Sequence, residues 1–179
     1  MRARHPLPRL WLMTDERMGE SLRDAIERLP RGSGIVFRHY GLPAATRRAL
    51  FQQVMQTARR RRLIVVRGGA DRLGRGDSGQ HGRIARRDRG LKTWPAHNAR
   101  ELIAGQRAGA DLIFVAPVFA TRSHPGARPL GTLRALALAR QARVPAIALG
   151  GMNARRGRML IGLGFYGWAA IDAWAAPKG

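Results

Sequence analysis

Short apolar runs recur along the chain, and amphipathic stretches separate most of them. One such run, Leu112 to Val115, ends before Pro117, and a polar loop then continues to Gly126. Strands with uninterrupted apolar runs are usually covered on both faces, which is typical of parallel sheets in α/β proteins. The alternation therefore predicts a parallel sheet with helices outside it. Ligands of such sheets bind at the carboxyl ends of the strands, so the loop after Val115 is the first candidate site.

The periodicity of the chain predicts eight strands and five helices. The strands are expected at Leu10–Met13, Gly34–Arg38, Leu63–Val66, Gly79–Gly82, Gly90–Thr93, Asp111–Val115, Pro145–Leu149 and Gly167–Ile171. The helices are expected at Glu20–Leu29, Pro43–Arg60, Asn98–Ala108, Leu130–Ala142 and Asn153–Leu163. Asn98 with Glu101 forms a plausible capping box, and Asn153 is the expected cap of the last helix.

One segment, Arg67 to Arg89, breaks this rhythm, because it is rich in glycine and has no convincing amphipathic helix. Eight strands favour a closed (β/α)8 TIM barrel, an α/β fold, over an open doubly wound sheet. No GxGxxG motif follows the first strand, which disfavours a dinucleotide-binding fold. Such barrels usually need about 200 residues or more. A degenerate third helix region and the lack of a full last helix account for the 179 residues here, which we treat as one barrel domain, residues 1–179.

The composition excludes several classes of site. The chain has no cysteine, which rules out disulfides, thiolate metal ligands and cysteine nucleophiles. The basic N-terminus precedes only a short apolar run, so we expect no signal peptide, and no run is long enough to span a membrane. These features fit a cytoplasmic protein without a membrane partner.

The formal net charge of +22 is extreme, and nearly all of it comes from arginine, since Lys92 and Lys178 are the only lysines. Such a charge suggests phosphate-bearing substrates or polyanions. The basic residues are scattered, however, and the one dense run, Arg59 to Arg62, lies at an expected helix end without interleaved aromatic residues. We therefore favour solvated arginines over a nucleic-acid site, although the charge does not exclude nucleic acid.

Several segments together resemble a known family. They are Trp11 to Asp15, Phe37-Arg38, Gly79 to His81, Thr93 to His97, Ala116 to Thr121 and Leu149 to Met152. In this order and spacing they resemble motifs of the thiamine phosphate synthase superfamily, over most of the chain. The resemblance implies a (β/α)8 barrel of thiamine (vitamin B1) biosynthesis that binds a small phosphorylated thiazole. The synthase branch couples hydroxymethylpyrimidine diphosphate to thiazole phosphate and releases pyrophosphate, whereas the tautomerase branch aromatises the thiazole by moving a proton.

The departures from the synthase pattern concern the diphosphate and its metal. The synthase carries Gln, Arg and Lys at alternate positions of its second strand, where this chain has Val36, Arg38 and Tyr40. The third strand of the synthase ends in Asn-Asp, and this Asp binds magnesium. The third strand of this chain ends in Val66-Arg67 instead. No acid follows Gly82 before Asp88, where a second magnesium-binding Asp is usual. We therefore assign no metal ligand and no certain cofactor, and expect Mg²⁺ only if a diphosphate substrate is used.

The resemblance places a proton-shuttling histidine of the tautomerase branch at His97, which we predict to be the catalytic acid and base, since imidazole exchanges protons near neutrality. A purely structural alternative is that His97 caps the following helix. Gly150 and Gly151 precede a helix and can offer backbone N–H groups to a phosphate. The other expected substrate- or phosphate-binding residues are Arg38, Thr121, Ser123 and His124. His39 and His81 receive no role.

Asp172 follows the last strand, near the expected phosphate, and would repel it unless it points away or pairs with an arginine. We favour a tautomerase-like protein with His97 as acid and base. Two alternatives stay open: a thiamine phosphate synthase with an altered, arginine-based diphosphate site, and a catalytically dead barrel that binds a polyanion. The sequence does not fix the oligomeric state.

Overall fold

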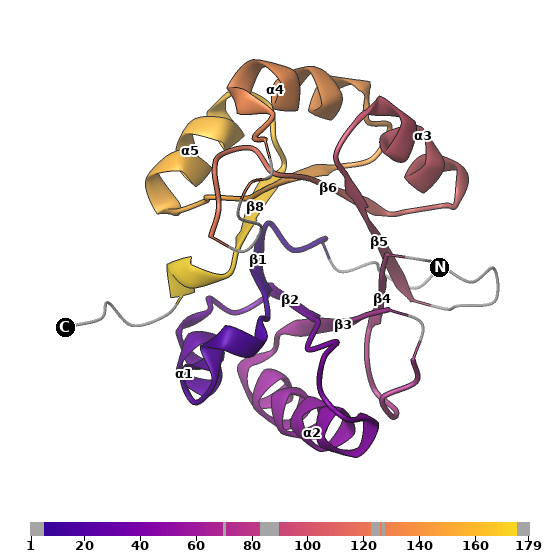
Figure 1. Ribbon diagram of the computed structural model, residues 1–179, viewed down its shortest axis with the longest axis vertical. Helices are drawn as coiled ribbons and strands as arrows, with labels where there is room; N and C mark the ends of the chain where they lie inside the picture. The colour runs from indigo at the N-terminus through magenta and orange to yellow at the C-terminus, as the bar shows by residue number, and fades with distance from the viewer. Residues whose placement is uncertain (1–5, 70, 83–89, 123–125, 127, 175–179) are drawn as a thin grey trace.

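The computed structural model describes residues 6–69, 71–82, 90–122, 126 and 128–174. Eight parallel strands close into one barrel in the order β1 to β8, with β8 pairing with β1. The strands are β1 Leu10–Met13, β2 Gly34–Phe37, β3 Ile64–Gly68, β4 Gly79–His81, β5 Leu91–Ala96, β6 Leu112–Val115, β7 Ala146–Leu149 and β8 Gly167–Ala170. The expected TIM-barrel fold is thus confirmed (Figure 1).

The described residues form five α-helices: α1 Ser21–Arg28, α2 Ala44–Arg61, α3 Ala99–Arg107, α4 Gly131–Gln141 and α5 Ala154–Gly162. Two short 3-10 helices, η1 Glu16–Met18 and η2 Asp172–Trp174, follow β1 and β8. Figure 1 shows α1 and α2 on one side of the barrel and α3, α4 and α5 on the opposite side. The described residues between β3 and β4 form no helix, as expected, and η2 stands where a full last helix would be.

The caps that were predicted from the sequence hold the helix starts. The Asn98 side chain accepts a hydrogen bond from the main-chain N–H of Glu101 at 2.9 Å, and Asn153 accepts one from Arg156 at 2.9 Å. The fifth strand differs from the expectation of Gly90–Thr93, because it continues to Ala96. Pairing with β6 sustains it past Pro95, and the Trp94 ring lies against Gly105 of α3.

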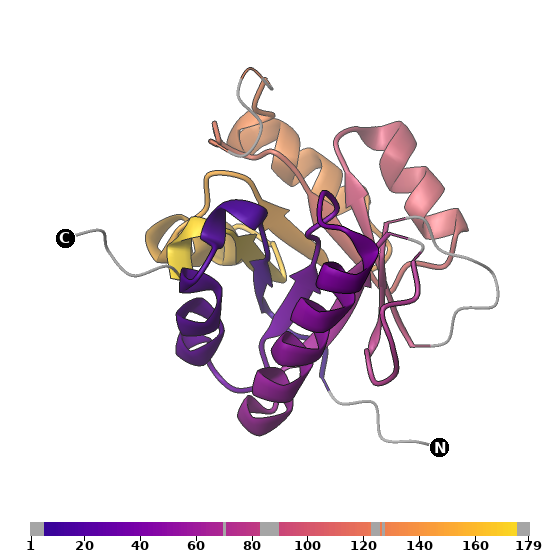
Figure 2. The same cartoon turned by 60° about the horizontal axis from the view of Figure 1, so that its bottom comes forward.

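The barrel interior is filled by large buried side chains. The rings of Trp11 and Phe114 meet edge to face at 5.3 Å between centroids, and His81 packs against the Phe114 ring at 5.1 Å. Phe37 points outward to Phe51 of α2, at 5.2 Å. Figure 2 shows α2 lying along the outside of the barrel. A filled interior leaves space for a ligand only at an end of the barrel, as in other barrels of this type.

Candidate active site

A cavity of about 490 Å³ opens at the carboxyl ends of the strands, and all eight strands or the loops after them contribute to its wall. Apolar side chains, among them Met13, Leu149 and Ile171, make up much of the wall. The carboxyl end of a parallel barrel is where such folds bind their ligands. The cavity is therefore the candidate active site.

Five residues that the sequence assigned to a site line this cavity: Arg38, His97, Thr121, Gly150 and Gly151. The other two, Ser123 and His124, lie outside the described residues. His81, which received no role from the sequence, also lines the cavity. Two signals could have identified it: its place at the end of a short strand, and the resemblance of Gly79 to His81 to a family motif.

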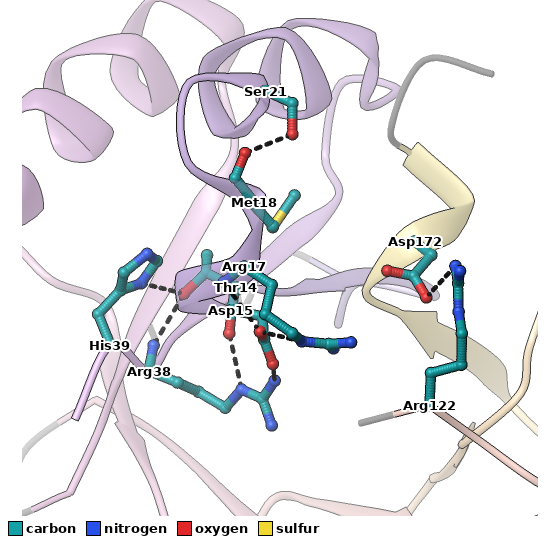
Figure 3. A network of polar contacts seen from close by, with 9 residues as sticks. All are labelled: Thr14, Asp15, Arg17, Met18, Ser21, Arg38, His39, Arg122 and Asp172. Atoms are coloured by element: carbon teal, nitrogen blue, oxygen red, sulfur yellow. Dashed lines mark hydrogen bonds and ion pairs between the residues drawn. The ribbon is translucent and has the colours of Figure 1, made fainter. Parts of the chain in front are cut away.

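Arg38 is held at the end of β2 by the loop after β1 (Figure 3). Its Nε donates to the carbonyl of Thr14 at 2.7 Å, and its Nη2 donates to Asp15 Oδ2 at 3.0 Å. Arg17 donates to the other oxygen of Asp15 at 2.7 Å. Burial raises the pKa of Asp15, but the hydrogen bonds from Arg17 and the charges of Arg17 and Arg38 outweigh it and lower that pKa below its ordinary value. Arg38 is thus a cation that is held in place, and Asp15 is its counter-ion.

His97 directly follows β5 and is paired with Glu101, in the first turn of α3. Its Nδ1 lies 2.6 Å from Glu101 Oε2, and its main-chain N–H donates to the same oxygen at 2.8 Å. Burial raises the pKa of Glu101, but the hydrogen bonds from His97 outweigh it and lower that pKa. An ionised carboxylate only accepts hydrogen bonds, so Nδ1 carries a hydrogen and Nε2 is the nitrogen left for proton exchange. The start of the helix is capped by the Asn98 side chain, which accepts from the main-chain N–H of Glu101.

Gly150 and Gly151 connect β7 to α5 in a conformation that glycine favours, with φ of 96° and 60°. A Cβ on Gly150 would lie 2.7 Å from Pro117, and one on Gly151 would meet the carbonyl of Ala120. The turn is tied to the loop after β6, because the N–H of Phe119 donates to the carbonyl of Gly150 at 3.1 Å. This close packing brings main chain rather than side chain to the cavity, beside the start of α5. Backbone at a helix start suits an anion.

Asp172, which also lines the cavity, pairs with an arginine, one of the two arrangements that would make it compatible with a phosphate. Arg122 Nη2 lies 3.0 Å from Asp172 Oδ2, and both side chains are exposed (Figure 3). The pairing removes part of the repulsion that a phosphate would meet. It also occupies an arginine of the loop after β6.

The acids near the mouth that the structure describes do not fit a magnesium ion. Asp15, Asp71 and Asp172 each lie within 3.0 Å of an arginine nitrogen. Arg67, at the strand end where the synthase pattern has its metal-binding Asp, is itself paired with Asp77 at 3.0 Å. Within the ranges that the structure describes, no three His, Cys, Asp or Glu side chains gather in a way that could hold a metal. Magnesium needs carboxylates that are free to bind it.

A family model described as thiamine monophosphate synthase matches residues 85–174, about half of the chain. The chain belongs to this family. The thiamine-phosphate synthase of Chloroflexus aurantiacus is 29% identical over 189 residues, which cover 94% of this chain and 85% of that protein. A putative thiamine-phosphate synthase 2 of Aquifex aeolicus is 32% identical over 77 residues, which cover 43% of this chain and only 41% of that protein.

Among solved structures, the thiamine phosphate pyrophosphorylase of Pyrococcus furiosus matches this thiamine monophosphate synthase family member with a TM-score of 0.76. The match has 22% sequence identity and covers 96% of this chain and 89% of that one, so it supports the fold. The family and the names of its relatives place the chain in thiamine biosynthesis and favour the synthase alternative over the tautomerase that the sequence had put first. No helix among the described residues is long and apolar enough to cross a membrane.

Proposed function

We propose that the chain catalyses the coupling of a pyrimidine diphosphate to a thiazole phosphate, as a thiamine phosphate synthase with an altered anion site. The observation that carries this proposal is that Arg38, His97, Thr121 and Gly150-Gly151, contributed by four different strand ends, line one cavity. Each comes from a segment in which the sequence resembles the family. The names of the relatives add support.

In this reaction the bond between the pyrimidine methylene carbon and a diphosphate oxygen breaks, and the thiazole nitrogen uses its lone pair to form the new carbon–nitrogen bond. Pyrophosphate leaves with the bonding electrons. The Gly150-Gly151 turn and the start of α5 hold the thiazole phosphate, and the Thr121 hydroxyl donates to it. Arg38 stabilises the charge that develops on the leaving diphosphate.

The test is to incubate the purified protein with both substrates and to measure thiamine phosphate by fluorescence after oxidation, together with released pyrophosphate. We expect both products in equal amounts. Gly151→Ala should abolish most of the rate, because its Cβ meets the carbonyl of Ala120. Gly162→Ala is the matched control, since a Cβ at this helical position meets nothing within 4 Å. Absence of product at any metal concentration would refute the proposal.

A second candidate, thiazole tautomerisation, is favoured by the pair of His97 and Glu101. Nε2 of His97 would take a proton from one ring atom and return it to another, while Glu101 holds Nδ1–H and stabilises the transient imidazolium. The test follows the absorbance of the non-aromatic thiazole carboxylate phosphate as it aromatises. Acceleration that is lost in His97→Gln supports this candidate. A rate equal to that in buffer removes it.

A further inference from the structure

The described part of the chain contains one buried histidine on the cavity wall that the proposed reactions do not use. His81 ends β4, is 6% exposed and lines the cavity. Its ring stands edge to face on Phe114, at an interplanar angle of 84°, so it is fixed by the packed interior below it. A rigid polar group at the boundary between the core and the cavity is placed to select a ligand.

The hydrogen bonds of its neighbour fix which nitrogen of His81 carries the hydrogen. His81 Nδ1 lies 2.8 Å from Oγ1 of Thr93, which is fully buried. The Thr93 hydroxyl donates its single hydrogen to the carbonyl of Gln80, at 3.4 Å. The hydroxyl therefore accepts from Nδ1–H, and the second ring nitrogen, Nε2, keeps its lone pair.

His81 also stays neutral at physiological pH. Burial, and after it the positive charge of Arg38, lower its pKa to about 3. A neutral imidazole with Nδ1–H presents Nε2 only as a hydrogen-bond acceptor. The same charge of Arg38 disfavours a cationic ligand group at this place.

The surroundings of His81 narrow the kind of donor further. Met13, Pro95 and Ile171 contribute apolar surface to the same cavity, which suits the face of an aromatic ring. An acceptor on such a wall is best matched by a neutral N–H at the edge of that ring. A ligand that lacks the N–H would leave Nε2 desolvated without a partner.

We propose that His81 is a specificity-determining residue that recognises a neutral amino group of a heteroaromatic substrate by accepting a hydrogen bond from it at Nε2. The proposal rests on the proposed function only in taking this cavity as the substrate site. For the coupling reaction, the ring whose amino group His81 recognises is an aminopyrimidine. His81 does not take part in the bond-making step.

The test compares two ligands on two matched variants by calorimetry. The ligands are hydroxymethyl-aminopyrimidine and the same pyrimidine with hydrogen in place of the amino group. In His81→Asn the side-chain amide can still donate to Thr93, but the Nε2 acceptor is gone. His81→Gln keeps a polar atom near the Nε2 position and serves as the conservative rescue.

We expect the native protein to bind the amino compound about five- to tenfold more tightly than its analogue. His81→Asn should reduce this preference to about twofold or less, and His81→Gln should restore part of it. A merely structural role would weaken both ligands equally and leave the preference unchanged, which would overturn the proposal. Equal binding of the two ligands by the native protein, or binding of neither, would overturn it as well.

Two further readouts keep the outcome decisive. If His81→Asn does not fold, nitrogen NMR of the native protein reports the Nδ1–H tautomer of His81 directly, and a shifted Nε2 resonance upon addition of the amino compound supports the proposal. An Nε2–H tautomer contradicts it. Product formation is measured separately. If the protein forms product but the His81 substitutions leave the ligand preference unchanged, this inference alone is refuted. If the preference depends on His81 but no product forms, the proposed function alone is refuted.

Discussion

Arg38 Nη2 lies 3.0 Å from Oδ2 of Asp15, so the arginine that the sequence assigned to a substrate anion has an internal carboxylate as its partner. Both side chains are largely buried, with 17% and 18% exposed. The same pairing of an acid with an arginine recurs at Asp71 and Asp172. The described carboxylates Asp15, Asp71 and Asp172 are thus each paired with an arginine, and these arginines meet a ligand with a carboxylate already beside them.

The pairing of these acids predicts that the site works without magnesium. We expect thiazole phosphate binding, and any coupling activity, to change by less than about twofold when the metal is removed by a chelator, because each of the described carboxylates at the mouth is paired with an arginine. Calorimetry of the thiazole phosphate and the initial rate, each with chelator and with added Mg²⁺, check this expectation. A tenfold or greater loss upon chelation would contradict it.

Removal of the charge at Asp172 should strengthen anion binding. In Asp172→Asn, Arg122 loses its ion-pair partner and the repulsion of a carboxylate on the cavity wall disappears. We expect inorganic phosphate to bind about two- to fivefold more tightly at low ionic strength, and this gain to fade at high salt because both side chains are exposed. Asp24→Asn, an exposed position on α1, makes the same charge change away from the cavity and should leave the affinity unchanged. Equal affinities of the two variants would disprove the effect.

The buried Arg47 should be a main support of the mouth. Its guanidinium donates to the carbonyls of Arg38 and Gly68, each at 2.9 Å, and to Asp71 at 2.8 Å. We expect Arg47→Met to lower the free energy of unfolding by about 2–4 kcal/mol, because two carbonyls lose their donors. Arg48→Met, at the exposed neighbouring position of α2, should change it by less than about 0.5 kcal/mol. Urea unfolding of both variants measures the difference, and similar values for the two would refute the assignment.

The lowered pKa of His81 predicts a pH dependence of stability. The ordinary pKa is 6.5 and that in the folded protein is about 3, so unfolding takes up a proton between these values. Folding stability is therefore fully present above pH 6.5 and is lost as the pH falls toward 3. The loss should be smaller in His81→Asn, because its unfolding takes up about one proton fewer in this pH range and the free energy of unfolding then changes less steeply with pH. Asp15 and Glu101, whose pKa values are also lowered, contribute equally to both proteins and cancel. Parallel curves of unfolding free energy against pH would contradict the expectation.

Much of the fold was predictable because its signals are local. The run Leu112 to Val115 is a buried strand, and the Asn98 and Asn153 caps start the helices that the sequence assigned to them. The end of β5 was predicted three residues too early, since Pro95 reads locally as a stop while its pairing with β6 comes from a distant segment. The family resemblance likewise rested on short motifs in a fixed order, and the matched family model confirms it.

What the sequence by itself determined is the set of elements, since hydrophobic period and capping residues act within a few positions of one another. Only the tertiary structure decided which charges meet. Arg38 and Asp15 are 23 residues apart, and Arg122 and Asp172 are 50 apart. Such partners are brought together because the parallel strands end on the same side of the barrel, which no local pattern encodes. The pairing of β4 with β5 likewise places His81 beside Thr93, and burial then makes an unassigned histidine a neutral acceptor on the cavity wall.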